Sequence, residues 1–427
     1  MTDIALISTL LRPRRLDAAS GSMLVAGAGL TALSFVFVVY MLMTEGHAAF
    51  NTSSDVAWGL PIAYYLFFLL ASSGLSVLAS LDLVFGMTLF QPVTKRLIWL
   101  AICTLVAGFS VLALEIGHPF RMLWALPFGM QIRSPLWWMG VFYSLDLVLL
   151  FIKFYLLHTG EWHSRFSHAI SLVSFVVVIC AAGTLGLVFG MMAMRPAWYS
   201  PVMPVYFMVS GFLTAIAFAV MFIGLAPSDE RHTPQVLDVR QVVLPRLFLV
   251  ALLGVIAISA GTYITGLWSN LDGLDIYRRQ LFSPRVNIEL WVGLIIPFLM
   301  VIGANARKNR RLLFWAALMT MVGMFFSRLN LLIVGQEVPL FRGHWISYTE
   351  YWPSFTEWML VPFGAGLFLA LYAAGEWLLN LSDSPKPVGE TTNPAVEPFT
   401  ALGFGLKRRS VAEGEKIRPM ERGGIVQ

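Results

Sequence analysis

Long apolar runs separated by polar breaks fill most of this 427-residue chain. A run of about 20 apolar residues is the length that an α-helix needs to cross a lipid bilayer. Ten runs of this kind are present, and each predicts one membrane-spanning helix. The predicted spans are 23–43, 60–86, 95–116, 136–156, 168–193, 203–226, 242–267, 288–306, 311–334 and 356–380.

The composition supports this interpretation. Hydrophobic residues make up 58% of the chain and charged residues only 12%, whereas a soluble domain carries about 25% charged residues. A soluble protein of this composition would need a very large core with almost no surface. The sequence therefore predicts an all-α, polytopic membrane protein with about ten transmembrane helices in two bundles.

The two ends of the chain differ from the ten-helix domain, which we place at residues 21–382. Residues 1–20 combine a short apolar stretch with Arg12, Arg14 and Arg15, which predicts either a helix lying on the membrane surface or a disordered segment. From 383 to 427 the composition changes to Ser, Pro, Thr and charge, which is typical of a disordered tail.

Positive charge predicts the orientation, because cytoplasmic loops carry an excess of Lys and Arg. With the N-terminus inside, 21 of the 29 Lys and Arg residues lie on the inner side and seven on the outer side. Both termini are therefore expected in the cytoplasm, and the chain is expected to be a multi-pass protein of the bacterial cytoplasmic (inner) membrane. The net charge of +5 then reflects anchoring in the membrane, and nucleic-acid binding is not needed to explain it.

The outer loops are long and rich in aromatic residues, whereas the inner loops are mostly short. Trp and Tyr at this level partly form the usual interfacial belt. The outer loops are longer than a simple connection between two helices requires, which predicts a docking platform on the outer face.

Ionisable groups at membrane depth are costly, so each one is a candidate functional residue. Glu115, His118 and Arg121 follow one another at intervals of three at the outer end of the third span. A carboxylate beside an imidazole at the edge of the hydrocarbon layer suits a proton-coupled redox carrier. The alternative is a helix-capping cluster at the interface.

Asp146 lies near the middle of the fourth span, with Tyr143 about one turn nearer the outside. A lone Asp at this depth is expected to face the bundle interior, either in a functional site or in a structural pair. Asp82 lies near the inner end of the second span, where it can begin a proton path or act as an interfacial carboxylate.

Arg328 lies in the outer half of the ninth span, while Glu289 and Glu357 begin the eighth and tenth spans from the outside. These three residues predict a buried ionic cluster at the outer level, or else a second carrier or proton-exit site.

Histidine and cysteine offer no metal site in the sequence. None of the seven His residues is expected within a span, so bis-His haem ligation is not predicted. His47, His158, His163, His168, His232 and His344 are expected at loops or surface edges. Cys103 and Cys180 lie far apart in apolar runs and are expected to be buried hydrophobes.

These residues carry a family resemblance. The stretch LEIGHPFRMLW, followed by RSPLWWMG, resembles a characteristic region of the NrfD/PsrC family of integral membrane subunits of respiratory reductases. The later stretches NIELWVGLIIPFLMVI, RLLFWAALMTMVGMFFSRLNLLI and YWPSFTEWMLV resemble its ten-helix, HybB/DsrP-like branch. The likeness covers about residues 20–380.

The resemblance implies a haem-free subunit that binds a quinone, menaquinone or ubiquinone, and contains no iron–sulfur cluster of its own. It implies a ferredoxin-like iron–sulfur subunit docked on the outer face, with one or more catalytic subunits beyond it. Carried over by position, the family's quinone pocket falls on Glu115, His118, Tyr143 and Asp146, with Arg121 close by.

Three alternatives remain open at this level. The chain is expected to be the quinone-reactive subunit of an oxidoreductase complex rather than an enzyme alone, and proton translocation through Asp82 and Asp146 is a further hypothesis. A secondary transporter would show broken helices at matching positions in two halves, but Pro297 and Pro362 both lie in the second half. A plain membrane anchor would need no buried Asp.

Overall fold

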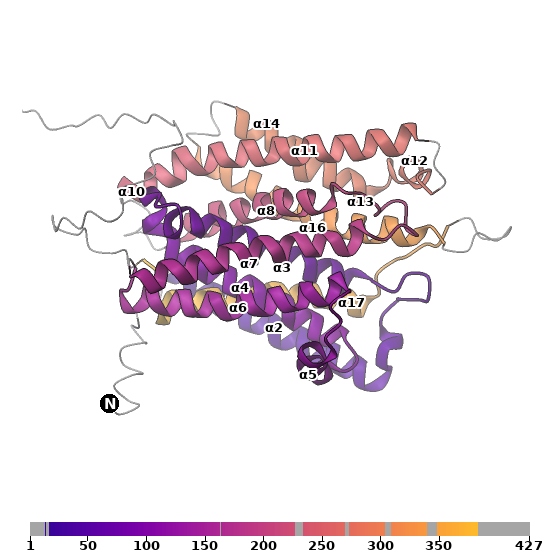
Figure 1. Cartoon of the computed structure of the whole chain (residues 1–427), viewed down its shortest axis with the longest axis horizontal. Coiled ribbons are helices and arrows are strands. Elements are labelled where there is room, and N and C mark those ends of the chain that lie inside the picture. Colours follow the sequence, from indigo (N-terminus) through magenta and orange to yellow (C-terminus); the bar gives the residue numbers. More distant parts are fainter. Residues whose placement is uncertain are drawn as a thin grey trace, which may run out of the picture. The chain divides into compact units, whose positions relative to one another are not determined.

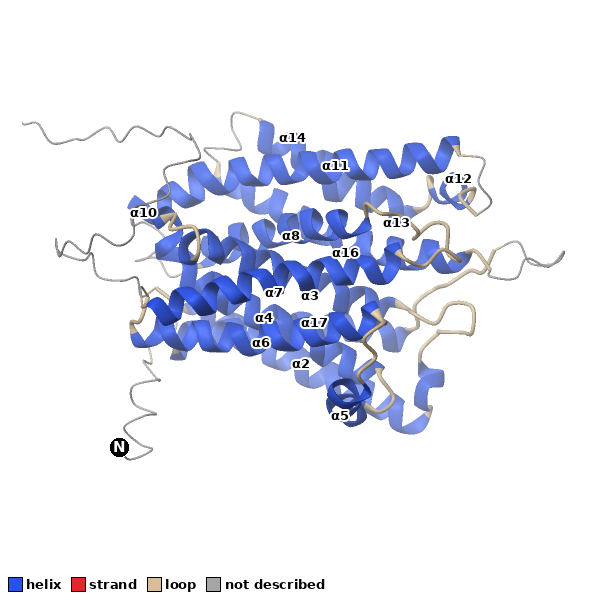
Figure 2. Ribbon diagram, viewed as in Figure 1, coloured by secondary structure: helices blue, strands red, loops and turns tan. Residues whose placement is uncertain are grey.

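The computed structural model describes Pro13 and residues 17–162, 164–226, 234–269, 273–303, 309–339 and 348–382. All of them belong to one compact unit, Met1–Gly389. The described residues form helices and loops without any strand (Figures 1 and 2). The expectations for most of segment 1–20 and for the tail 383–427 concern residues outside this description.

Ten helical segments among the described residues are long and apolar enough to cross a membrane, which confirms the predicted fold class. They are α2 (Ala18–Thr44), α3 (Leu60–Leu83), η2 (Thr88–Phe90) with α4 (Gln91–Glu115), α6 (Pro135–Thr159), α7 (Arg165–Gly190), α8 (Met203–Leu225), α10 (Pro234–Asp238) with η3 (Val239–Val243) and α11 (Leu244–Trp268), α13 (Pro284–Asn287) with η4 (Ile288–Ile295) and α14 (Ile296–Ile302), α16 (Arg310–Glu337), and α17 (Phe355–Leu378).

Local sequence explains where several of these helices begin. A proline occupies the first turn of α3, α4, α6, α8 and α11, where its missing N–H breaks no helical hydrogen bond. Side chains cap other helices: Ser164 accepts a hydrogen bond from the backbone N–H of Ser167 at the start of α7. Ser354 and Glu357 form a reciprocal capping box at the start of α17.

The helices pack into two groups with a pair beside them. Helices α3, α4, α6 and α7 form the first bundle, and α8, α11, η4–α14 and α16 form the second. The nearly fully buried α3 joins the bundles by packing against α8, while α2 lies along α17 and this pair contacts α4.

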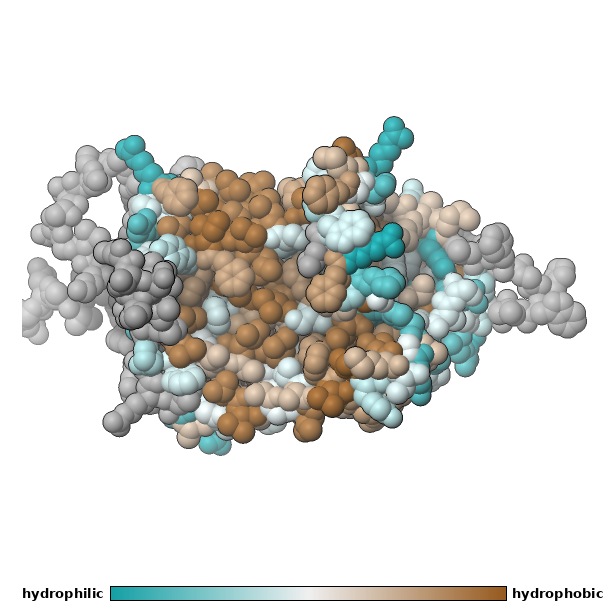
Figure 3. Space-filling view, turned by 90° about the horizontal axis from the view of Figure 1, so that it is seen from below, coloured by the Kyte–Doolittle hydropathy of each residue, from teal (hydrophilic) through white to brown (hydrophobic). Residues whose placement is uncertain are grey.

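The surface of the bundle has the polarity that a bilayer requires. Apolar side chains cover its middle, and hydrophilic residues gather toward its two ends (Figure 3). Large exposed apolar residues lie on α2, α6, α7 and α11, including Val25, Val148, Val176 and Val250. Because soluble proteins rarely expose an apolar surface of this extent, we assign it to contact with lipid.

The outer loops, for which the sequence predicted a docking platform but no helices, contain short helices. They are η1 (Gly46–Ala49), α5 (Pro119–Gly129) and α12 (Ile276–Gln280). Helices α5, α12 and α13 lie at one end of the bundle, which we call the loop-rich end, and α10 lies at the other (Figure 1). The loop-rich end is the one that the charge distribution predicts to face outward.

Two of the membrane segments contain π-helical turns. One is η3 and the other is η4, which ends two residues before Pro297. Proline has no N–H to donate to the preceding turn, so a widened turn beside it accommodates the missing hydrogen bond. π-Turns are rare and occur frequently at functional sites.

Four charged or titratable residues differ from the sequence-based expectation. His158 lies in the last turn of α6 and is buried, so its predicted surface position was wrong. The orientation argument includes Lys153 among the charges of the inner side, but the structure buries this residue inside α6. Lys95 and Arg96 also counted toward the inner loops, yet both are buried in the first turns of α4.

Candidate functional site

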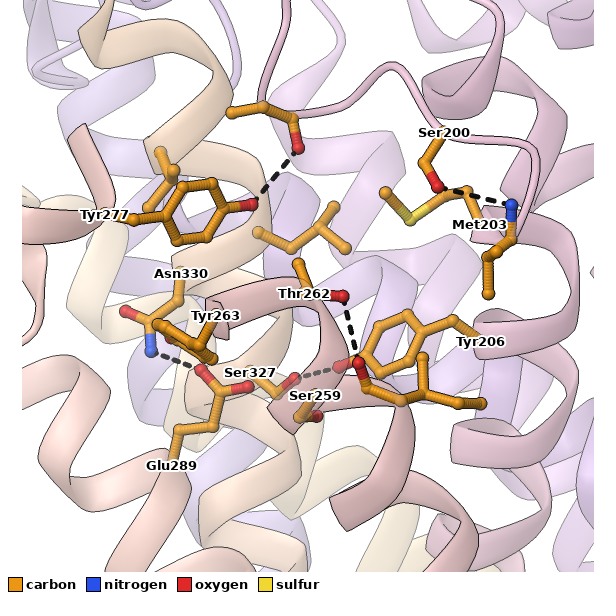
Figure 4. Close-up of a pocket in the computed structure, with 15 residues that line it drawn as sticks. Ser200, Met203, Tyr206, Ser259, Thr262, Tyr263, Tyr277, Glu289, Ser327 and Asn330 are labelled. Carbon is orange, nitrogen blue, oxygen red and sulfur yellow. Dashed lines mark hydrogen bonds between the residues drawn. The ribbon is translucent and has the colours of Figure 1, made fainter. Parts of the chain in front are cut away.

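A polar cavity lies within the second bundle at its loop-rich end (Figure 4). Its volume is about 100 Å³, and its walls come from α8, α11, α12, η4, α16 and the loop before α8. Its polar lining includes Ser200, Tyr206, Ser259, Thr262, Tyr263, Tyr277, Glu289, Ser327 and Asn330. A cavity with this many hydroxyl, amide and carboxyl groups can hold water or a small polar ring.

Glu289 is the acidic group of this cavity. Its side chain is buried, and its Oε2 accepts a hydrogen bond of 2.7 Å from Nδ2 of Asn330. Ser327, one turn earlier on α16, is a second hydrogen-bond partner of the carboxylate. Glu289 therefore projects from the π-helical η4 toward α16, and it is held there by two neutral donors rather than by a direct ion pair.

Tyrosine hydroxyls and rings form much of the cavity wall. The Tyr206 hydroxyl lies 2.6 Å from Oγ of Ser327 and also hydrogen-bonds Ser259. Ser327 thus links Tyr206 to Glu289. The rings of Tyr263 and Tyr277 meet edge to face with their centroids 5.5 Å apart.

Tyr277 closes the cavity toward the loops. Its hydroxyl donates to the carbonyl oxygen of Ala197 at 3.4 Å. Burial, with a smaller effect from nearby Glu289, raises the pKa of Tyr277 to about 12. The phenol therefore stays protonated at neutral pH and remains a hydrogen-bond donor.

Arg328 lies behind the cavity, fully buried on α16. Its Nη2 donates to Oγ of Ser210 at 2.6 Å, and its guanidinium lies 5.5 Å from the ring centroid of Tyr206. Its Nε and Nη1 have no hydrogen-bond partner among the described residues. The charges of Arg328 and Glu289 attract each other, so this part of the predicted outer cluster does come together.

Glu357 lies in a separate network at the start of α17. Its Oε1 accepts a hydrogen bond of 2.5 Å from the Tyr351 hydroxyl, and its Oε2 accepts from the backbone N–H groups of Ser354 and Asn51. Burial and the nearby carboxylate raise the pKa of Tyr351. These contacts tie the start of α17 to the loop after α2, and they do not connect Glu357 with the cavity.

Tyr143 and Asp146 lie together in the first bundle. Tyr143 is fully buried with its hydroxyl 3.0 Å from Oγ of Ser73. Oδ1 of the buried Asp146 lies 3.5 Å from Oγ of Ser174, and its Oδ2 has no hydrogen-bond partner among the described residues. The charge partner of Asp146 is Lys153, two turns along α6.

The remaining predicted residues lie apart from this pair. Glu115 is half-buried at the end of α4, close enough to Glu357 for the two carboxylates to repel each other. His118 and Arg121 are exposed at the start of α5. No hydrogen bond or ion pair of the described residues joins these three side chains to Asp146. At the other end of the bundle, Oδ2 of Asp82 accepts a hydrogen bond of 2.8 Å from Thr94.

Sequence reasoning missed several polar residues that the fold brings together. Lys153 and Asn330 lie inside the predicted spans 136–156 and 311–334, so their depth in the membrane was a usable signal. Tyr206 and Tyr263 were hidden in apolar runs, where an aromatic residue gives no sign of which face it occupies. Tyr277 lies in a loop whose short helix was not predicted.

No group of three or more His, Cys, Asp or Glu side chains within the described residues is arranged to hold a metal ion. The polar groups of the cavity are hydroxyls, an amide and one carboxylate, which suit hydrogen bonding to oxygen atoms of an organic ring.

The fold and the buried polar site define a class, that of multi-pass membrane proteins with ionisable groups enclosed between their helices. The model of the family described as polysulphide reductase, NrfD, matches residues 48–339, and the chain belongs to this family. This confirms the resemblance seen in the sequence. The chain is therefore a transmembrane subunit of the kind found in oxidoreductase complexes.

Two relatives cover most of the chain. A selenate reductase subunit of Mesobacillus selenatarsenatis is 23% identical over 84% of this chain and 96% of its own length. The Hdr-like menaquinol oxidoreductase integral membrane subunit of Archaeoglobus fulgidus is 22% identical over 81% of this chain and 88% of its own length.

Proposed function

We propose that the chain is the quinone-reactive membrane subunit of an oxidoreductase complex and that the quinone ring binds in the cavity around Glu289. The observation that carries this proposal is a buried carboxylate facing a cavity at the loop-rich end whose lining combines apolar surface with several hydroxyl groups and an amide. The relative that is named as a menaquinol oxidoreductase subunit supports the same ligand class. We place the protein in the bacterial cytoplasmic membrane with the loop-rich end outward.

A bound quinol supplies two electrons and two protons as it becomes a quinone, and the reverse reaction takes up the same number of each. Within the cavity, the Glu289 carboxylate is positioned to accept or return one proton. Tyr206 and Tyr263 present phenol groups beside it that can hold the ring oxygens by hydrogen bonds. Ser200, Thr262 and Tyr277 line the side nearest the loops and offer the second proton a route to water.

The electrons pass to or from a separate subunit that carries iron–sulfur clusters, in this proposal a ferredoxin-like protein docked on the loop-rich end. A catalytic subunit would lie beyond it. This arrangement requires the cavity to lie close to the docking surface. The cavity walls include α12 and the loop before α8, which both belong to the loop-rich end.

Substitution of Glu289 by Gln in the intact complex tests the proposal. The change keeps size and one acceptor but removes the proton acceptor, so quinol turnover is expected to fall about 100-fold or more. Glu350→Gln serves as the matched control, because Glu350 is exposed at the same end and pairs with Arg279. Unchanged turnover in Glu289→Gln, with normal complex assembly, would contradict the proposed site.

For the first bundle we propose a different role, proton transfer through Asp146 and Lys153 with Asp82 nearer the other end. The buried pair of opposite charge and the hydroxyls of Ser76 and Ser174 beside it support this. Asp146→Asn is expected to reduce proton translocation by reconstituted vesicles while quinol binding at the cavity persists.

The same variants separate this account from a quinone pocket in the first bundle at Glu115, His118, Tyr143 and Asp146. If Asp146→Asn and His118→Ala abolish quinol turnover while Glu289→Gln leaves it intact, the quinone reacts in the first bundle. If only Glu289→Gln abolishes turnover, the cavity of the second bundle is the reactive site.

A further inference from the structure

We propose that the second bundle binds the phosphate group of an anionic phospholipid at the end opposite the loop-rich end. The site is a small basic pocket between the end of α8, η3 and the start of α16. This is the end at which α10 lies (Figure 1). The pocket is separate from the Glu289 cavity, and its charges take no part in the proposed redox chemistry.

The lining of the pocket combines positive charge with a small volume. Arg240 and Gln241 of η3 line it together with Arg310 from the first turn of α16. The other walls come from α8 and α16, through Val220, Gly224, Leu313 and Phe314. The volume is about 40 Å³. Because one enclosed water needs about 10–15 Å³, there is room for about three groups of that size, which suits a phosphate group.

Arg240 brings the first positive charge to the pocket. Its side chain is half-buried, and its Nη2 lies 3.5 Å from the position that a Cβ would take at Gly224, near the end of α8. The carbonyl groups at the end of a helix stabilise one nearby positive charge. They account for an arginine at position 240, but they do not account for the second arginine in the same pocket.

That second positive charge is Arg310. Its side chain is exposed, and it forms no ion pair with any residue that the structure describes. The side chain of Asn309 already accepts hydrogen bonds from the backbone N–H groups of Arg311 and Leu312. An anion in the pocket is therefore held by the arginine and Gln241 side chains rather than by the start of α16.

The first bundle treats its cations at this end differently. Arg96 pairs with Glu376, and Nζ of Lys95 donates to the carbonyl oxygen of Asn380 at 2.8 Å. In the second bundle, the described lining of the pocket contains two arginines and no carboxylate. A concave site with charge of one sign attracts a ligand of the opposite sign, and basic pockets between transmembrane helices bind anionic lipid headgroups.

The surface beside the pocket favours a lipid over a free anion. Val242 follows Gln241 on η3 and is exposed, and Trp315 of α16 is exposed as well. Trp315 lies about 7.5 Å further along the helix than Arg310, and tryptophan is enriched at the level of lipid headgroups. A phospholipid can place its phosphate at the arginines while its acyl chains follow this apolar surface.

Titration of the purified, delipidated complex with phosphatidylglycerol, with bound lipid counted by native mass spectrometry, tests the site. Arg310→Gln is expected to weaken lipid binding about fivefold, which is the contribution of one basic residue near an anionic lipid. Arg311→Gln is the matched control, because Arg311 is also exposed on the first turn of α16 but does not line the pocket. It should bind lipid like the wild type.

Gln241→Glu tests the same pocket without the removal of an arginine. Gln241 is exposed, so a side chain of the same size is tolerated by the fold. The new carboxylate repels the lipid phosphate, and binding of phosphatidylglycerol is expected to fall about fivefold or more.

Two further titrations identify the source of the phosphate group. Phosphatidylcholine, which has no net charge, should bind more weakly than phosphatidylglycerol, and excess inorganic phosphate should not displace the lipid. Equal binding of the two lipids, or displacement by inorganic phosphate, would overturn the assignment to an anionic lipid. Equal losses in Arg310→Gln and Arg311→Gln, or unchanged binding in Arg310→Gln and Gln241→Glu, would overturn the pocket itself.

Discussion

At the residue scale, the second bundle encloses an acid and a base that share no direct ion pair. Glu289 is held by Asn330 and Ser327, and Arg328 by Ser210 and the rings of Tyr206 and Phe207. A carboxylate held by neutral donors can change its protonation state without breaking a salt bridge. This distinguishes the site from the purely structural ion pair at the opposite end of the bundle.

That ion pair joins Arg96 of α4 to Glu376 of α17. Two nitrogens of the guanidinium donate to the two carboxylate oxygens at 3.0 and 3.1 Å, and both side chains are nearly fully buried. Removal of one partner leaves an uncompensated buried charge. We therefore expect Glu376→Gln to lower the free energy of unfolding by about 3–5 kcal/mol.

Thermal unfolding of the purified protein in detergent, followed by intrinsic tryptophan fluorescence, measures this effect. The double variant Arg96→Met with Glu376→Leu removes both charges and should recover most of the lost stability. If the single and double variants unfold at the same temperature as the wild type, the pair does not stabilise the fold.

The sequence predicted the charged residues of the site but not their neutral partners. Glu289 and Arg328 were found because charge within an apolar run is conspicuous. Their neutral partners, such as Ser327 and Tyr206, were not found, because Ser and Tyr within a span are common and only the fold shows which of them meet. Lys153 lies inside a predicted span but near its inner end, where a long side chain can also reach the interface, so its depth was a weaker signal than that of Arg328.

At the scale of elements, the contact between η4 and α16 fixes the position of Glu289. A Cβ added at Gly323 would lie 1.9 Å from the Cα of Gly293, so the two helices touch through their backbones. This close approach requires glycine at both positions. It brings the π-helical segment near enough to α16 for Asn330 to hold the Glu289 carboxylate.

We expect Gly323→Ala to push η4 away from α16, which lowers stability by about 1–3 kcal/mol and lowers quinol turnover as well. Gly183→Ala is the control, because a Cβ at Gly183 of α7 meets no atom within 4 Å. Turnover and unfolding temperature are measured for both variants. Identical behaviour of the two would show that the glycine contact does not position the site.

The ten long helices were predictable because a bilayer imposes one length and one polarity on each span. The predicted spans agree with the helices to within a few residues at most ends. The π-turns of η3 and η4 were not predicted, because the prolines that follow them indicate a local disturbance of the helix but not the form it takes. Helix α5 was not predicted either, because its 11 residues are too short to form a span.

At the scale of the whole molecule, the two bundles divide the candidate chemistry. The first encloses the Asp146–Lys153 pair near mid-membrane, and the second encloses the Glu289 cavity near the loop-rich end. The family resemblance placed the quinone in the first bundle, whereas the cavity geometry favours the second. A resemblance in sequence indicates which residues match the family's site, but it does not show where the folded side chains leave space for a ligand.

The central claim is that the quinone ring binds between α11, η4 and α16. Photoaffinity labelling of the intact complex with an azido-menaquinone, followed by mass spectrometry of the labelled peptides, tests it most directly. We predict labelled residues in Leu244–Trp268 or Ile288–Ile295, with labelling abolished by excess unmodified menaquinone. Competable labelling confined to α3, α4 and α6 would contradict the claim.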